Sequence, residues 1–115
     1  MAKITSKAKR LRVYIGEDDH WQGKALYQAI VMKAKELDMA GATVFRGVMG
    51  YGAHSRIHSA HLLDLSSDLP LLVEIVDSEE YMEKLMPYLD EIVKEGMVTL
   101  EDIEVIKYGQ KPPTR

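Results

Sequence analysis

The chain has 115 residues, 46% of them hydrophobic and 29% charged, with a formal net charge of −3 and no cysteine. This length fits one domain, which we expect over residues 9–109, between a basic tail at 1–8 and a C-terminal tail at 110–115. The lack of cysteine excludes disulfides, thiol nucleophiles and cysteine-ligated metal centres. The acidic balance argues against nucleic acid as a partner. The chain carries no apolar run of about 18 residues and no leading signal segment, so we expect no membrane insertion and a cytoplasmic location.

Three elements are predicted in the first half of the chain. Residues 10–16 alternate apolar and polar side chains, which is typical of a half-buried strand. Residues 23–38 carry apolar side chains three and four positions apart and are followed by Gly41, a pattern that predicts a helix. Residues 42–48 are rich in β-branched and apolar side chains and predict a second strand.

Three more elements are predicted in the second half. Residues 69–76 are a strongly strand-forming run. The acidic segment 77–80 then supplies a cap for a helix that keeps its apolar phase to Gly96, with a kink or short break expected just before Pro87. Residues 102–108 alternate again and predict the last strand.

The resulting order, β-α-β-β-α-β, is that of an α+β, ferredoxin-like fold, with two helices on one face of a four-stranded antiparallel sheet. The other face of the sheet is then left bare. Its expected members are Arg12, Tyr14, Leu72, Glu74, Val76, Glu104, Ile106 and Tyr108. Five of these eight side chains are apolar or aromatic, which favours homo-oligomerisation through this face.

The segment after the second predicted strand has the composition of an anion site. Residues 39–63 contain no carboxylate, although the protein as a whole is acidic. Gly50, Tyr51 and Gly52 can form a turn whose backbone N–H groups face phosphate oxygens. The candidate side-chain contacts are Arg46, Arg56, His58 and Lys107. A glycine-rich loop with no ligand remains an alternative, as does a plain surface role for Lys107.

Two other chemistries are open at this point. His54, His58 and His61 are spaced four and three residues apart, so they would share one face of a helix and could hold zinc, copper or nickel. The cluster of Glu17, Asp19 and His20 would suit general acid–base catalysis in an enzyme.

Four runs of sequence carry a resemblance to a known family. RVYIGEDDHWQGKALYQAIV, GATVFRGVMGYGAHSRIH, LSSDLPLLVEIVDSEE and EGMVTLEDIEVIKY resemble the PII-like proteins of the family called domain of unknown function 190. That family is similar in fold to the PII nitrogen-regulatory proteins, which are trimers with adenine nucleotide bound in clefts between subunits. The resemblance implies a homotrimeric regulatory module and not an enzyme.

The resemblance also implies roles for individual residues. Thr43, Gly50 and Gly52 stand where the PII pattern has a nucleotide-contacting threonine and the glycines at the base of a signalling loop. The PII loop that holds a phosphate-binding lysine is replaced here by residues 95–101, which lack a lysine and include acids. We therefore expect AMP or ADP as the ligand, and an unidentified target protein that reads the loop over residues 50–66.

Overall fold

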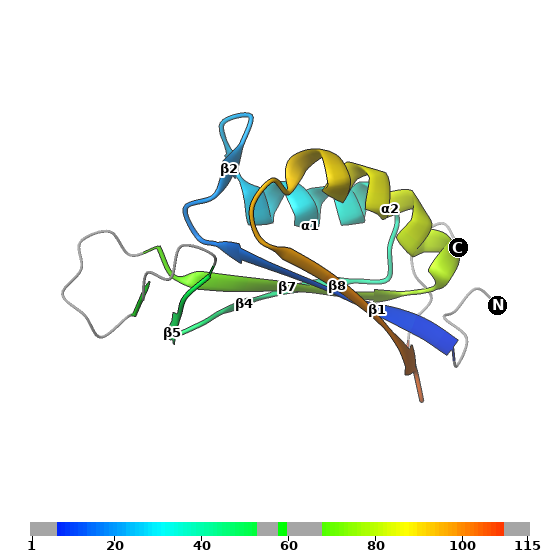
Figure 1. Cartoon of the computed structure of the whole chain (residues 1–115). Helices are drawn as coiled ribbons and strands as arrows, with labels where there is room; N and C mark the ends of the chain where they lie inside the picture. Colours follow the sequence, from blue (N-terminus) through cyan, green and yellow to red (C-terminus); the bar gives the residue numbers. More distant parts are fainter. Residues whose placement is uncertain (1–6, 53–57, 60–67, 110–115) are drawn as a thin grey trace.

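The computed structural model describes residues 7–52, 58–59 and 68–109, and these form a sheet with a helical layer on one side. The four strands of the main sheet are β1 (Lys7–Gly16), β4 (Ala42–Arg46), β7 (Pro70–Asp77) and β8 (Met97–Glu104). They lie in the order β4-β7-β1-β8, and every neighbouring pair is antiparallel. The helices α1 (Leu26–Glu36) and α2 (Glu79–Ile92) both lie on the same side of this sheet (Figure 1). The predicted ferredoxin-like α+β fold is confirmed.

The hydrophobic core lies between the sheet and the two helices. Leu11, Val13 and Ile15 of β1 alternate with outward side chains, and cross-strand partners such as Val73 and Ile75 of β7 face the same way. The helices close the core with one apolar stripe each, and all their buried residues belong to it. The alternation in the sequence of the two central strands therefore reflects their burial on one face only.

Two short hairpins extend the ends of this framework. The first pairs β2 (His20–Trp21) with β3 (Lys24–Ala25), and Gln22 and Gly23 form its turn at φ values of 49° and 78°. The second pairs β5 (Met49–Gly50) with β6 (His58–Ser59). Residues 23–25, predicted to begin a helix over 23–38, belong to the first hairpin, and α1 begins at Leu26.

α2 begins at a capped turn and continues past a proline. The side chain of Ser78 accepts a hydrogen bond from the backbone N–H of Tyr81 at 3.4 Å, and Glu79 and Glu80 place acidic groups in the first turn. The helix continues through Pro87 without a break. No helix of the described ranges is long and apolar enough to cross a membrane.

The last strand differs from the prediction. β8 spans Met97–Glu104, so it begins and ends earlier than the predicted 102–108. It pairs with β1 from Lys7↔Glu104 to Tyr14↔Met97, and this register is fixed by the partner strand. Residues 105–108 lie beyond the strand and continue on the side of the sheet away from the helices (Figure 1).

The composition of the open sheet face changes with this register. Glu104 pairs with Lys7 on the helix side, and Ile106 and Tyr108 lie outside the strand, so their predicted places on the sheet are wrong. β8 instead contributes Met97, Thr99 and Glu101 to the open face. One row of cross-strand partners runs across all four strands and is apolar: Phe45, Leu72, Tyr14 and Met97. We call this the apolar row; Phe45 is 49% exposed and Met97 53% exposed.

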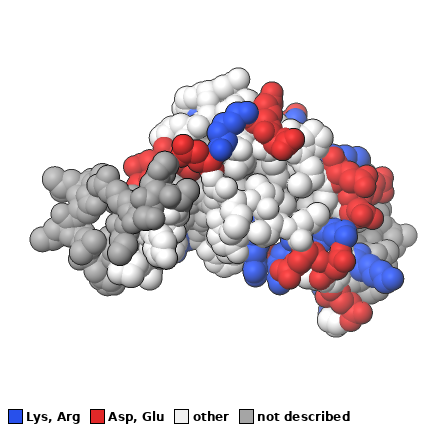
Figure 2. Space-filling model, in the orientation of Figure 1, with Lys and Arg blue, Asp and Glu red and all other residues white. Residues whose placement is uncertain are grey.

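Charged side chains lie beyond the apolar row. Arg12 and Glu74 are cross-strand partners with a 3.0 Å ion pair, and Arg10 is paired with Glu101 on the neighbouring strand. Figure 2 shows blue and red side chains interleaved at the end of the molecule away from β5. The open face thus consists of an apolar row at one end and internally neutralised charges at the other.

Candidate functional site

Two pockets open on the sheet, one near each end of β7. The strand-end pocket has a volume of about 300 Å³ and lies where β7 begins. Its lining consists of Tyr14, Ile15, Gly16, Asp19, Met49, Gly50, Tyr51, Gly52, Asp68, Pro70, Leu71, Glu95 and Gly96. The sheet-face pocket has a volume of about 280 Å³ and is lined by Ala40, Gly41, Ala42, Thr43, Glu74, Val76, Val105 and Tyr108. Of the predicted site residues, Thr43 lines the sheet-face pocket, and Gly50, Tyr51 and Gly52 line the strand-end pocket.

The strand-end pocket contains the glycine segment, residues 50–52, but this segment does not form the predicted turn: Gly50 belongs to β5, and neither Gly50 nor Gly52 has a positive φ. Gly50, Tyr51 and Gly52 all line the pocket, and the Tyr51 side chain is 71% exposed. The chain just before this segment is held against the first residue of β7, because the N–H of Gly47 donates to the Pro70 carbonyl at 2.7 Å. A Cβ on Gly47 would lie 2.8 Å from the Pro70 ring, so only glycine fits this approach. The chain thus reaches the pocket in a fixed path before residue 51.

Three carboxylates also line the strand-end pocket, and its described lining residues include no lysine or arginine. Asp19 accepts a hydrogen bond from the N–H of Gly16 at 2.9 Å, and Asp68 accepts one from the N–H of Asp18 at 2.9 Å. These contacts hold two carboxylates beside the pocket. Glu95, from the turn before β8, adds a third. These three carboxylates repel negative charge on a ligand.

Arg46, a predicted phosphate contact, has another partner in the structure. Its guanidinium forms an ion pair with the carboxylate of Glu17, which follows β1. The Arg46 side chain is 61% exposed, whereas that of Glu17 is 21% exposed. Arg46 precedes the glycine segment by four residues but does not line the strand-end pocket.

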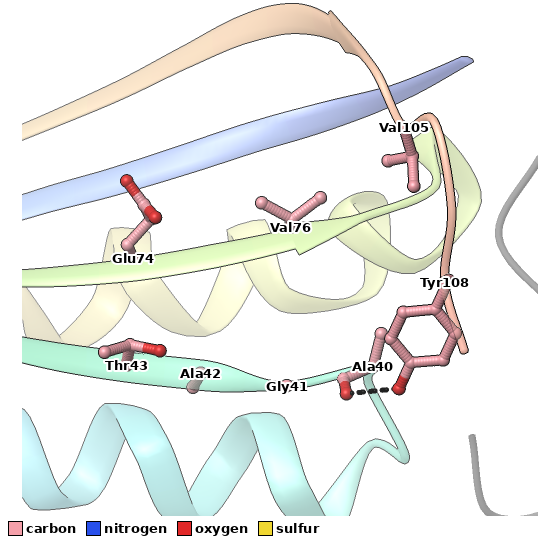
Figure 3. A pocket seen from close by; sticks show the side chains of 8 residues that line it. All are labelled: Ala40, Gly41, Ala42, Thr43, Glu74, Val76, Val105 and Tyr108. Atoms are coloured by element: carbon pink, nitrogen blue, oxygen red, sulfur yellow. Dashed lines mark hydrogen bonds between the residues drawn. The ribbon is translucent and has the colours of Figure 1, made fainter. Parts of the chain in front are cut away.

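The sheet-face pocket holds the predicted threonine. Thr43 of β4 and Glu74 of β7 are cross-strand partners that both line it (Figure 3). Glu74 accepts a hydrogen bond from Arg12 Nε at 3.0 Å, and this bond raises the pKa of Arg12. Val76, Val105 and the Tyr108 ring supply apolar lining. The pocket therefore combines apolar walls with a fixed carboxylate.

The remaining predicted nucleotide contacts fall outside both pockets or outside the described residues. Lys107 is exposed and lies between two residues that line the sheet-face pocket. His58 belongs to β6, where its backbone pairs with Gly50. Arg56 lies outside the described residues.

The two alternative chemistries are also placed only in part. His54 and His61 lie outside the described residues, and within the described ranges no group of three His, Asp or Glu side chains is arranged to hold a metal. The proposed acid–base cluster is divided among different partners: Glu17 binds Arg46, Asp19 binds the Gly16 N–H, and the His20 ring contacts the Asp18 carbonyl.

Sequence reasoning missed several residues that the fold brings to the pockets. Asp68 and Glu95 line the strand-end pocket but lie far from the glycine segment in sequence. Val105 and Tyr108 line the sheet-face pocket but were predicted to be in a strand. The acidic replacement at 95–101 was the one signal for Glu95. Only the antiparallel pairing of β1 with β7 and β8 brings these segments together.

Comparisons with known proteins agree with this fold. The family model DUF190, described as uncharacterized ACR, COG1993, matches residues 8–105. A UPF0166 protein from Aquifex aeolicus is 44% identical over 102 residues, covering 87% of this chain and 94% of its own length. A UPF0166 protein from Methanocaldococcus jannaschii is 35% identical over 102 residues, covering 88% of this chain and 94% of its own length.

A solved structure shows the same fold at low sequence identity. It is CPII from Thiomonas intermedia K12, a nitrogen regulatory PII-like protein bound to ADP, AMP and bicarbonate. The two structures align with a TM-score of 0.62 and 18% identity, over 88% of this chain and 90% of that one. The chain therefore belongs to the DUF190 family, and its fold is that of the PII-like protein CPII.

Proposed function

We propose that this protein is a PII-like regulatory module, a homotrimer that binds AMP or ADP in clefts between subunits. The observation that carries the proposal is the division of the candidate residues between two shallow pockets. Thr43 lines one pocket and Gly50 to Gly52 line the other. Each pocket has about 280 to 300 Å³, at the lower limit of the roughly 300 to 1,000 Å³ typical of ligand sites.

Association of copies joins the two halves. In a closed ring, the sheet-face pocket of one copy meets the strand-end pocket of the next, and the apolar row supplies the contact. The Glu74 carboxylate and apolar walls suit the amino group and ring of a base. The glycine segment suits a phosphate, because no Cβ at Gly50 or Gly52 blocks the approach to the backbone N–H groups. The ADP and AMP bound to CPII support an adenine nucleotide as the ligand.

The carboxylates of the strand-end pocket limit how many phosphates are accepted. Asp19, Asp68 and Glu95 repel added negative charge, so AMP binds at least as well as ADP, and ATP binds least. The module transmits the bound state to an unidentified target protein through the segment after Gly52 and catalyses no reaction.

Calorimetric titration of the purified protein with AMP, ADP and ATP tests the proposal. We expect micromolar binding of AMP and weaker binding of ATP. Replacing Glu95 with glutamine (Glu95→Gln) removes one repelling charge at nearly constant size, so it should improve ADP and ATP binding severalfold and AMP binding less.

The matched control is Glu91→Gln, because Glu91 is exposed on α2 and lines neither pocket. This variant should leave all three affinities unchanged. Failure of the wild-type protein to bind any adenine nucleotide more tightly than about 1 mM would refute the proposed function. A preference for ATP over AMP would refute the role of the carboxylates.

A further inference from the structure

The chain after β8 crosses the open face of the sheet. β8 is one edge strand and β4 is the other, yet residues 105–108 reach from the end of β8 to the start of β4. Val105 and Tyr108 line the sheet-face pocket together with Val76 of the inner strand β7. Ile106, between them, is 86% exposed. We call residues 105–109 the strap.

One hydrogen bond ties the strap to the far edge of the sheet. The Tyr108 hydroxyl donates to the backbone carbonyl of Ala40 at 2.8 Å (Figure 3). The bond is partly buried and spans 68 positions of sequence. The bond holds the strap against the edge of the sheet opposite the strand from which the strap comes.

The residue that receives the strap is itself held firmly. The N–H of Ala40 donates to the carboxylate of Asp77 at 2.8 Å, and Asp77 is fully buried. The same carboxylate accepts from the N–H of Ser78, the cap of α2, at 2.7 Å. A chain of contacts thus runs from the strap through Ala40 and Asp77 to the start of α2. The acceptor of the Tyr108 bond is therefore held in place by contacts that do not involve the strap.

We propose that the strap is a wall of the sheet-face pocket that is latched by the Tyr108–Ala40 hydrogen bond, and that Tyr108 is a positioning residue for the ligand. With the latch closed, Val105 and the Tyr108 ring line the pocket together with Thr43 and Glu74. With the latch open, the pocket loses this wall and its ligand leaves faster. The part of this inference that concerns the ligand rests on the proposed function.

The variant Tyr108→Phe tests the latch, because it keeps the ring and removes only the hydroxyl. In the ligand-free protein, backbone NMR order parameters of residues 105–109 should be about 0.85 in the wild type and below about 0.6 in the variant. The dissociation rate of AMP, measured by stopped flow, should rise about two- to tenfold, which matches the loss of one hydrogen bond.

The matched control is Tyr27→Phe, because Tyr27 is half-buried on α1 and lines neither pocket. It should leave both the order parameters of the strap and the AMP dissociation rate unchanged. A merely stabilising role for Tyr108 would lower the melting temperature without raising the dissociation rate, and that result would overturn the positioning role.

The two proposals fail separately. Order parameters that are equally high in the wild type and Tyr108→Phe, or equally low in both, would overturn the latch whatever the protein binds. If the wild-type protein binds no adenine nucleotide, the proposed function falls, and the latch is then decided by the order parameters alone.

Discussion

Gly96 shows how much one residue decides at the start of β8. Its φ is +124°, and a Cβ added there would lie 2.4 Å from the Tyr14 carbonyl oxygen. The replacement Gly96→Ala therefore combines backbone strain with a clash against fixed backbone. We expect the free energy of unfolding to fall by about 1 to 3 kcal/mol, measured by urea denaturation.

The control for this variant is Gly41→Ala. Gly41 has no positive φ, and a Cβ there meets no atom within 4 Å. Its free energy of unfolding should stay near that of the wild type. Equal stability of the two alanine variants would contradict the geometry at Gly96.

At the scale of elements, Pro87 lowers the stability of α2. Pro87 is exposed in the middle of the helix, where it lacks the N–H that would donate one turn back. Pro87→Ala should restore this bond and raise the free energy of unfolding by about 1 to 3 kcal/mol. Glu83→Ala, also exposed in α2, is the control and should change stability little. A less stable Pro87→Ala protein would show that the proline fits a bend required by packing.

The elements were predicted well from the sequence where burial of one face produces a regular pattern of apolar residues. β1 and β7 each place alternate residues in the core, and α1 and α2 each bury one stripe, so their periods are visible. β8 is an edge strand with mostly exposed residues, so its alternation carries no burial signal and its limits depend on pairing with β1. The glycines of residues 50–52 are visible in the sequence and line a pocket, although they do not form the predicted turn. Asp68 and Tyr108 reach the pockets only through the tertiary fold, which no local pattern shows.

At the scale of the whole molecule, the apolar row is the surface through which we propose that copies of the chain associate. Phe45→Glu places a charge at the β4 end of the apolar row and should weaken association of subunits at least about tenfold, measured by sedimentation velocity. Met32→Glu is the control, because Met32 is 61% exposed on α1, on the helical layer. A wild-type protein that sediments as a monomer at micromolar concentration would contradict the trimer.

The placement of Thr43 and Gly52 in different pockets has a genetic consequence. In the proposed ring, every cleft takes one half from each of two neighbouring chains, so no chain owns a complete site. A chain with a ruined sheet-face pocket and a chain with a ruined strand-end pocket are each inactive alone. When they are co-expressed in equal amounts and assemble at random, about one cleft in four receives both intact halves. Two defective alleles therefore complement each other, and a single defective allele acts on clefts shared with wild-type neighbours.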